Sequence, residues 1–490
     1  MLVRLDGNGR LNQRLYRGLR AAIREGRFAP GSRLPSTRSL ARDLGLSRNV
    51  VLTAFAQLVD EGYAEGRGGS GTFVSSTLPD PLLAPSPYGA RTKAPEAHPR
   101  LSAHADRVLA LAPLPAVGRP PRAGLRYDFR YGVPAVAEFP QQIWSRLVAR
   151  RARRMSINTL RYGRALGFSP LCEAIADYVR RARGVAATAE QVIIVNGSQQ
   201  ALDLVARLLI DRGARVAIEE PAYLSARQVF AAAGASLLPV PVDEHGIDVS
   251  QLPHGKDVRL AYVTPSHQFP LGGVLPLGRR LELLRWADEA GGWVVEDDYD
   301  SEFWYDGRPV EAIQGLDSTG RVIYIGTLSK VLFPSLRLGY LIAPEPIVPA
   351  LAALKFLMDR HAPTFEQEVL ADFITEGHFE RHVRRARARN ASRRAAMLDS
   401  FRELLGDRVE IVGENAGIHM VVWLRGTPAA CMHDLIARAA DRGLGIYSVA
   451  PHYLEPPATT GLLLGYACLT EREIRDGVRL LAEVIETLGK

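Results

Sequence analysis

The feature that most constrains the fold is an alternation of short apolar runs with helical patterns, which begins near residue 126. The strand-like runs are QVIIVNG, ARVAIEE, RLAYVTP, GWVVEDDY and VIYIGTLS, and segments with apolar residues at helical spacing lie among them. Parallel strands need a crossover connection, which a helix usually supplies, so the alternation predicts an α/β domain with a mostly parallel sheet. From about residue 395 the pattern adds the strand EIVGENAGIHMVVWL and two helical segments.

The first 76 residues follow another pattern. Apolar residues at helical spacing over 11–26 precede STRSLARDLG, a helix for which Ser36 is the expected N-cap and Gly45 the end. A third helix, RNVVLTAFAQLVDEG, has Ser47 as its expected cap, and YAEGRGGSGTFV predicts two short strands around a glycine-rich tip. Helix, helix, short turn, helix and hairpin is the order of a winged helix-turn-helix.

The charge of this segment favours a nucleic-acid partner. Residues 1–76 hold twelve arginines, no lysine and six acidic residues, a net charge of +6, whereas the whole chain of 490 residues carries +8. A polyanion is therefore expected to meet the N-terminal end. The side chains and glycines placed to reach DNA are Arg33, Ser36, Thr37, Arg38, Ser47, Arg48, Asn49, Arg67, Gly69 and Gly71.

Residues 77–125 are dense in proline and lack an apolar period, which predicts an extended, semi-rigid linker. No run of about eighteen apolar residues predicts a membrane span, and the N-terminus lacks the apolar run of a signal peptide. The three cysteines, Cys172, Cys431 and Cys468, have no metal-ligand or redox spacing. We expect them to be small buried side chains in a reducing cytoplasm, and we predict no metal site.

A lysine draws attention in the stretch GTLSKVLFPSLRLGY. Lys330 follows the run VIYIG, at the expected carboxyl end of a strand, where ligands of open α/β sheets bind. Alone it would be read as a surface lysine on a loop. Two other strand ends change that interpretation. Residues 196–200, NGSQQ, can hold a phosphate at a helix N-terminus, and the acids of WVVEDDYDSEF can hold a cation.

Both parts of the chain resemble known families. LPSTRSLARDLGLSRNVVLTAFAQLVDEGYAEGRGGSGTFV resembles the DNA-binding domain of the GntR regulators, and residues 126–490 resemble the fold-type I pyridoxal-phosphate enzymes, class I aminotransferases in particular. The second resemblance implies that Lys330 forms a Schiff base with the cofactor, Asp297 pairs with the pyridine nitrogen, Tyr299 bonds the ring 3-oxygen and Tyr223 stacks on the ring. The implied phosphate cup is Ser198, Gln199, Thr327, Ser329 and Arg337.

Together the halves resemble the MocR subfamily of GntR transcriptional regulators, with a winged helix over 8–76, a linker over 77–125 and an effector domain over 126–490. The pair His267-Gln268 in TPSHQFPLGG is typical of these regulators. The resemblance implies a cytoplasmic head-to-tail homodimer, in which Tyr162 reaches the partner subunit's phosphate. It also implies binding to paired half-sites of double-stranded DNA and to a small-molecule effector. The predicted effector contacts are Tyr447, Ser448, His452 and Tyr453, and His419 is either near the site or a packed core histidine.

The chain departs from aminotransferases at Leu463, which stands in GLLLGYACL where they have the arginine that clamps the substrate α-carboxylate. Leucine cannot supply that fork, so we expect full transamination to be lost and Schiff-base chemistry to remain. The domain would then sense an amine, an amino acid or pyridoxal phosphate itself. The alternative is an active aminotransferase that its winged helix only localises. The runs RLVARRARR and RHVRRARARNASRR are either solvated or dimer-contact helices or a second DNA track.

Overall fold

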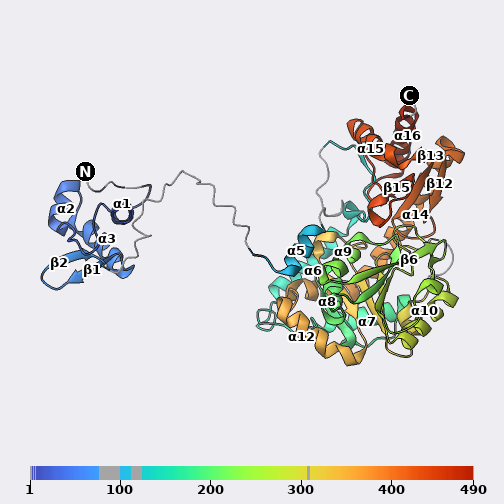
Figure 1. Cartoon of the computed structure of the whole chain (residues 1–490), viewed down its shortest axis with the longest axis horizontal. Helices are drawn as coiled ribbons and strands as arrows, with labels where there is room; N and C mark the ends of the chain where they lie inside the picture. Colours follow the sequence, from blue (N-terminus) through green and yellow to red (C-terminus); the bar gives the residue numbers. More distant parts are fainter. Residues whose placement is uncertain are drawn as a thin grey trace. The chain divides into compact units, whose positions relative to one another are not determined.

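The computed structural model of the chain describes residues 3, 5, 7–76, 100–111, 124–305 and 310–488 (Figure 1). The chain divides into two compact units, Met1–Arg100 and Leu101–Lys490. Among the helices of these described ranges, none is long and apolar enough to cross a membrane.

The N-terminal unit has the predicted winged helix-turn-helix order. Its elements are α1 (Leu11–Arg24), α2 (Thr37–Leu44), α3 (Arg48–Asp60), β1 (Ala64–Arg67) and β2 (Gly71–Val74). Both predicted N-caps form: Ser36 Oγ accepts a hydrogen bond from Ser39 N at 3.1 Å, and Ser47 Oγ accepts one from Val50 N at 3.4 Å. Gly45 ends α2 in the left-handed conformation that glycine adopts without strain. Side chains of α1 and α3 form most of the core of this unit.

The large unit is built on an eight-stranded sheet of order β4–β11–β10–β9–β8–β5–β6–β7. The strands are β4 (Val192–Val195), β5 (Arg215–Glu220), β6 (Ser236–Asp243), β7 (Gly246–Ile247), β8 (Val258–Val263), β9 (Trp293–Asp298), β10 (Val322–Thr327) and β11 (Gly339–Ile342). Neighbours from β10 to β6 pair in parallel, whereas β11 is antiparallel to β10 and β4, and β7 is antiparallel to β6. The predicted mostly parallel sheet is confirmed.

Helices cover both faces of this sheet. Successive side chains of a strand point to opposite faces, so Val192 and Ile194 of β4 belong to one buried cluster and Ile193 and Val195 to another. The first cluster includes α7 (Ser169–Arg183) and α13 (Thr364–Thr375), and the second includes α8 (Ser198–Leu209), α9 (Leu224–Ala233) and α12 (Val348–Asp359). The remaining helices and strands of this part are β3 (Tyr127–Asp128), α6 (Gln141–Arg153), α10 (Leu277–Ala290) and α11 (Ile313–Leu316). Burial on both faces explains why the strands read as nearly continuous apolar runs.

A smaller antiparallel sheet forms the C-terminal part. Its strands β12 (Val409–Val412), β13 (His419–Pro428) and β15 (Thr459–Gly465) pack with α14 (His378–Leu404), α15 (Met432–Asp441), β14 (Leu444–Gly445) and α16 (Glu471–Thr487). The prediction of one strand over EIVGENAGIHMVVWL is wrong, because the segment forms two strands, β12 and the first part of β13. Two glycines lie between these strands, Gly413 with a φ of 78° and Gly417 with a φ of 75°, and only glycine adopts this backbone readily.

Most of the predicted linker, residues 77–125, lies outside the described residues. Within it Ala103–Ala110 form a helix, α5, so the expectation of an extended segment is wrong there. His104 Nδ1 and Arg107 Nε lie 3.0 and 2.9 Å from Ala232 O, at the end of α9. This part of the predicted linker is therefore docked on the large unit (Figure 1).

Candidate functional site

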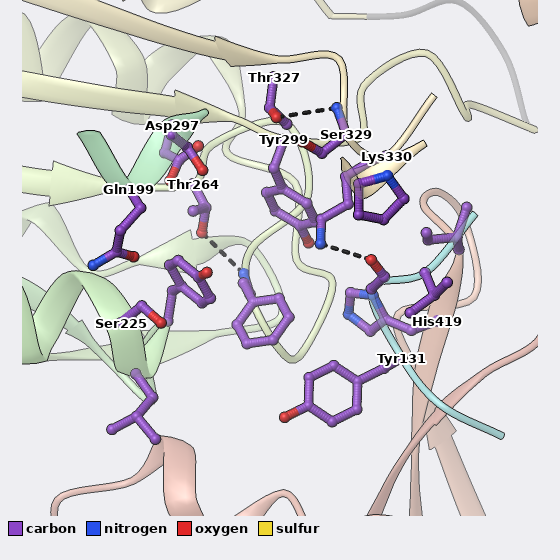
Figure 2. A pocket seen from close by; sticks show the side chains of 18 of the residues that line it. Tyr131, Gln199, Ser225, Thr264, Asp297, Tyr299, Thr327, Ser329, Lys330 and His419 are labelled. Carbon is purple, nitrogen blue, oxygen red and sulfur yellow. Dashed lines mark hydrogen bonds between the residues drawn. The ribbon is translucent and has the colours of Figure 1, made fainter. Parts of the chain in front are cut away.

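A cavity of about 400 Å³ lies at the carboxyl ends of the parallel strands. Asp297 comes from the end of β9, Thr327 from the end of β10, and Thr264 follows β8 (Figure 2). The structure brings ten of the residues predicted from the sequence into its wall: Ser198, Gln199, Tyr223, Asp297, Tyr299, Thr327, Ser329, Lys330, Arg337 and His452. These positions are far apart in the sequence, and the sheet is what gathers them.

Lys330 is held at the cavity wall by the turn that follows β10. Ser329 N donates a hydrogen bond to Thr327 Oγ1 at 3.2 Å, and Lys330 Nζ donates one to Gly132 O at 2.7 Å (Figure 2). Loss of hydration in the cavity lowers the pKa of Lys330, against the opposing charges of Asp300 and Asp297. A lowered pKa raises the share of neutral amine, which is the nucleophilic form.

Asp297 presents an unpaired oxygen to the cavity. Its Oδ2 accepts a hydrogen bond from Tyr262 at 2.7 Å, whereas Oδ1 is buried without a hydrogen-bond partner among the described residues. Burial raises the pKa of Asp297 to about 6, although the Tyr262 bond opposes the shift. Buried carboxylate oxygens are rarely left unpaired, so this atom is suited to a cationic N–H group of a ligand.

The opposite end of the cavity is suited to an anion. Ser198 and Gln199 open α8, whose first N–H groups and dipole favour negative charge. Arg337 Nη2 donates to Asn196 O at 2.8 Å, beside the N-cap Gly197. Gly197 has a φ of 83°, which favours glycine, and a Cβ there would lie 3.0 Å from that Nη2 atom, so the guanidinium packs closely on the backbone. Ser225, in the first turn of α9, also lines the cavity, and the sequence analysis missed it.

The pair His267-Gln268 braces the cavity wall. Tyr299 OH donates to His267 O at 3.0 Å and lies 2.9 Å from His267 Nδ1, which is 3.1 Å from Asp300 Oδ2. Gln268 Nε2 donates to Pro221 O and Phe269 O, both at 2.8 Å. The two side chains thus fix the orientation of Tyr299 and the course of the TPSHQFPLGG segment.

His267, Asp300 and His419 offer ligand atoms that all lie within 4.8 Å of one another, a grouping the sequence analysis did not foresee. All three side chains are buried. A Cβ on Gly272 would lie 2.9 Å from His267 Nε2, so backbone covers that nitrogen, and Nδ1 is paired with Asp300. His419 lines the cavity and is 1% exposed, so it is both a core histidine and a site residue.

The predicted effector residues separate into two layers. His452 lines the cavity, whereas Tyr447, Ser448 and Tyr453 are absent from its described wall. Tyr447 lies one layer back, with its ring edge against Tyr131 at 5.8 Å between centroids. The sequence analysis missed Tyr131, because it lies far upstream in an irregular segment that carries no periodic signal.

Tyr162 lies outside this cavity and is 78% exposed. The Arg360 guanidinium stacks 4.8 Å from the centre of its ring. Met155, Ile157 and Leu160 are exposed on the same segment, so apolar side chains are concentrated on the surface there.

The predicted DNA-contacting residues lie at the surface of the N-terminal unit. All ten are exposed except Thr37, which is half-buried. Arg67 is paired with Glu65 at 2.7 Å and stacks on Phe73, and a Cβ on Gly71 would lie 3.0 Å from Arg33 Nε. Arg33 therefore sits against the hairpin, which keeps the two basic side chains at the wing.

Acidic neighbours pair several arginines of the two basic runs. Arg150 and Arg151 on α6 both bind Asp372, and Arg389 and Arg393 on α14 both bind Glu138 at 2.5 Å. These ion pairs reduce the positive charge that the two runs could offer to a second DNA track, and the choice between a solvated and a dimer-contact face stays open.

The expectation of three buried cysteines is confirmed for Cys172 alone, since Cys431 is half-buried and Cys468 is exposed.

Comparisons with known proteins agree with the two units. The family of class I and II aminotransferases matches residues 135–481, and the gntR family of bacterial regulatory proteins matches residues 11–74. Among solved structures, LysN, the α-aminoadipate aminotransferase of Thermus thermophilus, is 30% identical with a TM-score of 0.71, covering 79% of this chain and 97% of its own. The kynurenine aminotransferase of Pyrococcus horikoshii is 28% identical with a TM-score of 0.69, covering 82% and 98%. The fold and cavity thus define a fold-type I aminotransferase-like domain joined to a winged helix-turn-helix domain.

Relatives along nearly the whole chain are regulators. The probable rhizopine catabolism regulatory protein MocR of Rhizobium meliloti is 38% identical, covering 97% of this chain and 94% of its own. TauR of Rhodobacter capsulatus is 37% identical, covering 89% and 88%, and the pyridoxine biosynthesis regulator PdxR of Corynebacterium glutamicum is 32% identical, covering 96% and 94%. The chain belongs to the MocR subfamily of the GntR family of transcriptional regulators.

Proposed function

We propose that this regulator binds pyridoxal phosphate in the cavity around Lys330 and changes its hold on operator DNA when an amine, an amino acid or the cofactor itself occupies that cavity. The observation that carries the proposal is the unpaired, buried Oδ1 of Asp297, which shares one cavity with Lys330 and the anion-binding end at Arg337. A ring with a protonated nitrogen, an aldehyde and a phosphate matches all three groups.

The residues present fit this cofactor. Asp297 would hold the ring nitrogen and Tyr223 the ring face. Tyr299, whose hydroxyl donates to His267 O in this structure, would turn that hydroxyl to the ring oxygen. The phosphate would be held at the start of α8 by Ser198, Gln199, Thr327, Ser329 and Arg337. The bound cofactor supplies an aldehyde that condenses reversibly with primary amines. The structure of LysN contains N-(5'-phosphopyridoxyl)-L-leucine, which supports the same use of this cavity here.

A sensor is favoured over an enzyme because Leu463 fills the position of the expected carboxylate clamp. Leu463 lies on β15 with no exposed surface, packed in a cluster with Tyr131, Phe269, Val421 and Val449. Such a site can bind an amine without orienting an α-carboxylate for transfer. The bound ligand would change DNA affinity only to the extent that it binds two conformations of the protein differently.

In this proposal the active species is a cytoplasmic, head-to-tail homodimer. The exposed Tyr162 would reach the phosphate in the partner subunit, and the two winged helices would bind paired half-sites.

The test is a footprint on the DNA upstream of the protein's own gene, with and without pyridoxal phosphate. We expect protection of two half-sites that the cofactor alters, and we expect Lys330→Ala to protect the same half-sites without the cofactor response. A response in Lys330→Ala equal to that of the native protein would contradict the role of the lysine. Absent protection together with amino-group transfer to a keto acid would favour the aminotransferase instead.

A further inference from the structure

Positive charge is scarce in the cavity. The described residues that line the cavity include one lysine, Lys330, and one arginine, Arg337. In the proposed function Lys330 meets the aldehyde, and Arg337 meets the phosphate beside the start of α8. When an amine displaces it, Lys330 Nζ can return to Gly132 O, which lies 2.7 Å from it in this structure, and loss of hydration lowers the pKa of Lys330 and so favours its neutral amine. In the proposed function the cavity therefore offers little positive charge to a further anionic group.

Two histidines lie in the same wall, but neither supplies a charge. His452 is 2% exposed, and its Nε2 lies 3.4 Å from Tyr131 OH. Burial lowers the pKa of His452 to about 4. Burial and the neighbouring His267 lower the pKa of His419 well below its ordinary value. At neutral pH both rings are uncharged and can offer only neutral hydrogen bonds.

The rest of this wall is aromatic and apolar. The Tyr131 and Phe269 rings lie 6.2 Å apart, the Phe269 and His452 rings lie 4.9 Å apart, and Leu463 packs behind them. The nearby Arg130 is engaged elsewhere, because its Nε lies 3.3 Å from Tyr447 OH and 3.6 Å from Asp128 Oδ2. A carboxylate pressed against this wall would lose its water and gain no cation.

We infer that the effector read by this cavity is a small primary amine whose other substituents carry no charge. The inference rests on the proposed function, since the amine is recognised at the cofactor. The substituent would be apolar, aromatic or hydroxylated, because the Tyr131 hydroxyl and the His452 ring both line this wall and can offer neutral hydrogen bonds. The cavity of about 400 Å³ is at the small end of ligand pockets and must also hold the cofactor, which limits the amine's size.

The experiment compares matched ligand pairs that differ by one carboxylate. Full-length protein loaded with pyridoxal phosphate is titrated with phenethylamine against phenylalanine, tyramine against tyrosine, and butylamine against γ-aminobutyrate. The readouts are the shift of the cofactor absorption band and the affinity for the upstream DNA. We expect half-saturation by the uncharged member at a concentration at least tenfold below that of its carboxylated partner.

Equal or tighter binding of the carboxylated members would overturn the inference and leave the proposed sensor intact. The inference would also be overturned if no amine changed the cofactor absorption band or the DNA affinity while pyridoxal phosphate alone altered the footprint. That result would indicate the cofactor itself as the effector. Failure to bind pyridoxal phosphate at all would instead refute the proposed function. A second experiment repeats the titrations with two variants. His452→Arg should lower the half-saturating concentration of the carboxylated ligands relative to their uncharged partners, whereas the neutral control His452→Gln should not.

Discussion

Glu219, the penultimate residue of β5, shows how one buried side chain organises the approach to the cavity. It accepts hydrogen bonds from Thr264 N at 3.1 Å, from Thr264 Oγ1 at 2.6 Å and from Gln268 Nε2 at 3.3 Å. Burial raises its pKa to about 7, although these bonds favour the charged form. In the sequence, Gln268 is notable only because the His267-Gln268 pair is typical of the family that the chain resembles. The structure adds a hydrogen bond from Gln268 to Glu219, which lies 49 residues upstream.

This shift makes stability depend on pH in a definite direction. The folded pKa is raised, so Glu219 contributes stability below its unfolded pKa, near 4.5, and that contribution is lost as pH rises through about 7. Glu219→Gln removes this dependence. Between pH 4.5 and 7.5 we expect the free energy of unfolding of the variant to rise relative to the native protein by about 3 kcal/mol. Urea titrations of both proteins at several pH values measure the difference, and parallel curves would contradict the prediction.

Asp297 gives a second pH dependence, in ligand binding. Its pKa of about 6 means that the carboxylate loses its charge as pH falls through 6, and with it the attraction for a protonated ring nitrogen. Between pH 7 and 5 we expect the affinity of the native protein for pyridoxal phosphate to fall by about tenfold more than that of Asp297→Asn. Fluorescence titration with the cofactor gives both profiles. If the two profiles have the same slope, Asp297 is not the group that holds the ring nitrogen.

At the scale of elements, the sequence predicts well those features that depend on residues close together in the chain. The caps at Ser36 and Ser47 and the buried strand β10 depend on residues within one turn or one strand, and all three are found. The sequence could predict many of the polar residues that line the cavity, because they stand at or next to the ends of strands. The position of Tyr131 in the cavity wall could not be predicted, because only tertiary folding brings it there.

Helix α5 was missed for a related reason. Its eight residues give two turns, too few for a clear apolar period, and none of its residues is buried. Its position comes instead from bonds to a carbonyl at the end of α9, 125 or more residues away in sequence. Helix α9 begins beside Tyr223, a wall residue of the cavity, so one helix connects the cavity to α5.

We expect the double substitution His104→Ala and Arg107→Ala to release α5 from α9. Each lost hydrogen bond is worth about 1 kcal/mol, so amide exchange over 103–110 should accelerate about tenfold or more. Hydrogen exchange with mass spectrometry measures this directly. The neighbouring exposed Arg100→Ala is the control and should leave exchange unchanged, whereas unchanged exchange in the double variant would show that other contacts hold α5.

At the scale of the whole molecule, the exposed apolar segment around Tyr162 predicts a subunit interface. Ile157 and Leu160 are 63% and 68% exposed. Large apolar side chains that lie together on the surface often mark a protein–protein contact. If the proposed dimer forms, Ile157→Asp with Leu160→Asp should convert it to monomers at micromolar concentration and weaken the proposed binding of pyridoxal phosphate. Sedimentation velocity measures the first effect and cofactor titration the second. The control Leu281→Asp, on α10, should change neither, and a double variant that stays dimeric would place the interface elsewhere.

The docking of α5 also sets how many residues connect the two units. With α5 held on α9, the connection from residue 75 to residue 102 is 27 residues long, which limits its reach to about 100 Å if it were fully extended. Release of α5 would extend it to about residue 126, near the start of β3. In the proposed dimer, a longer connection would lower the effective concentration of each winged helix at the second half-site. The docking of an eight-residue helix would thereby raise the avidity of the proposed dimer for paired sites while every contact with DNA stays the same.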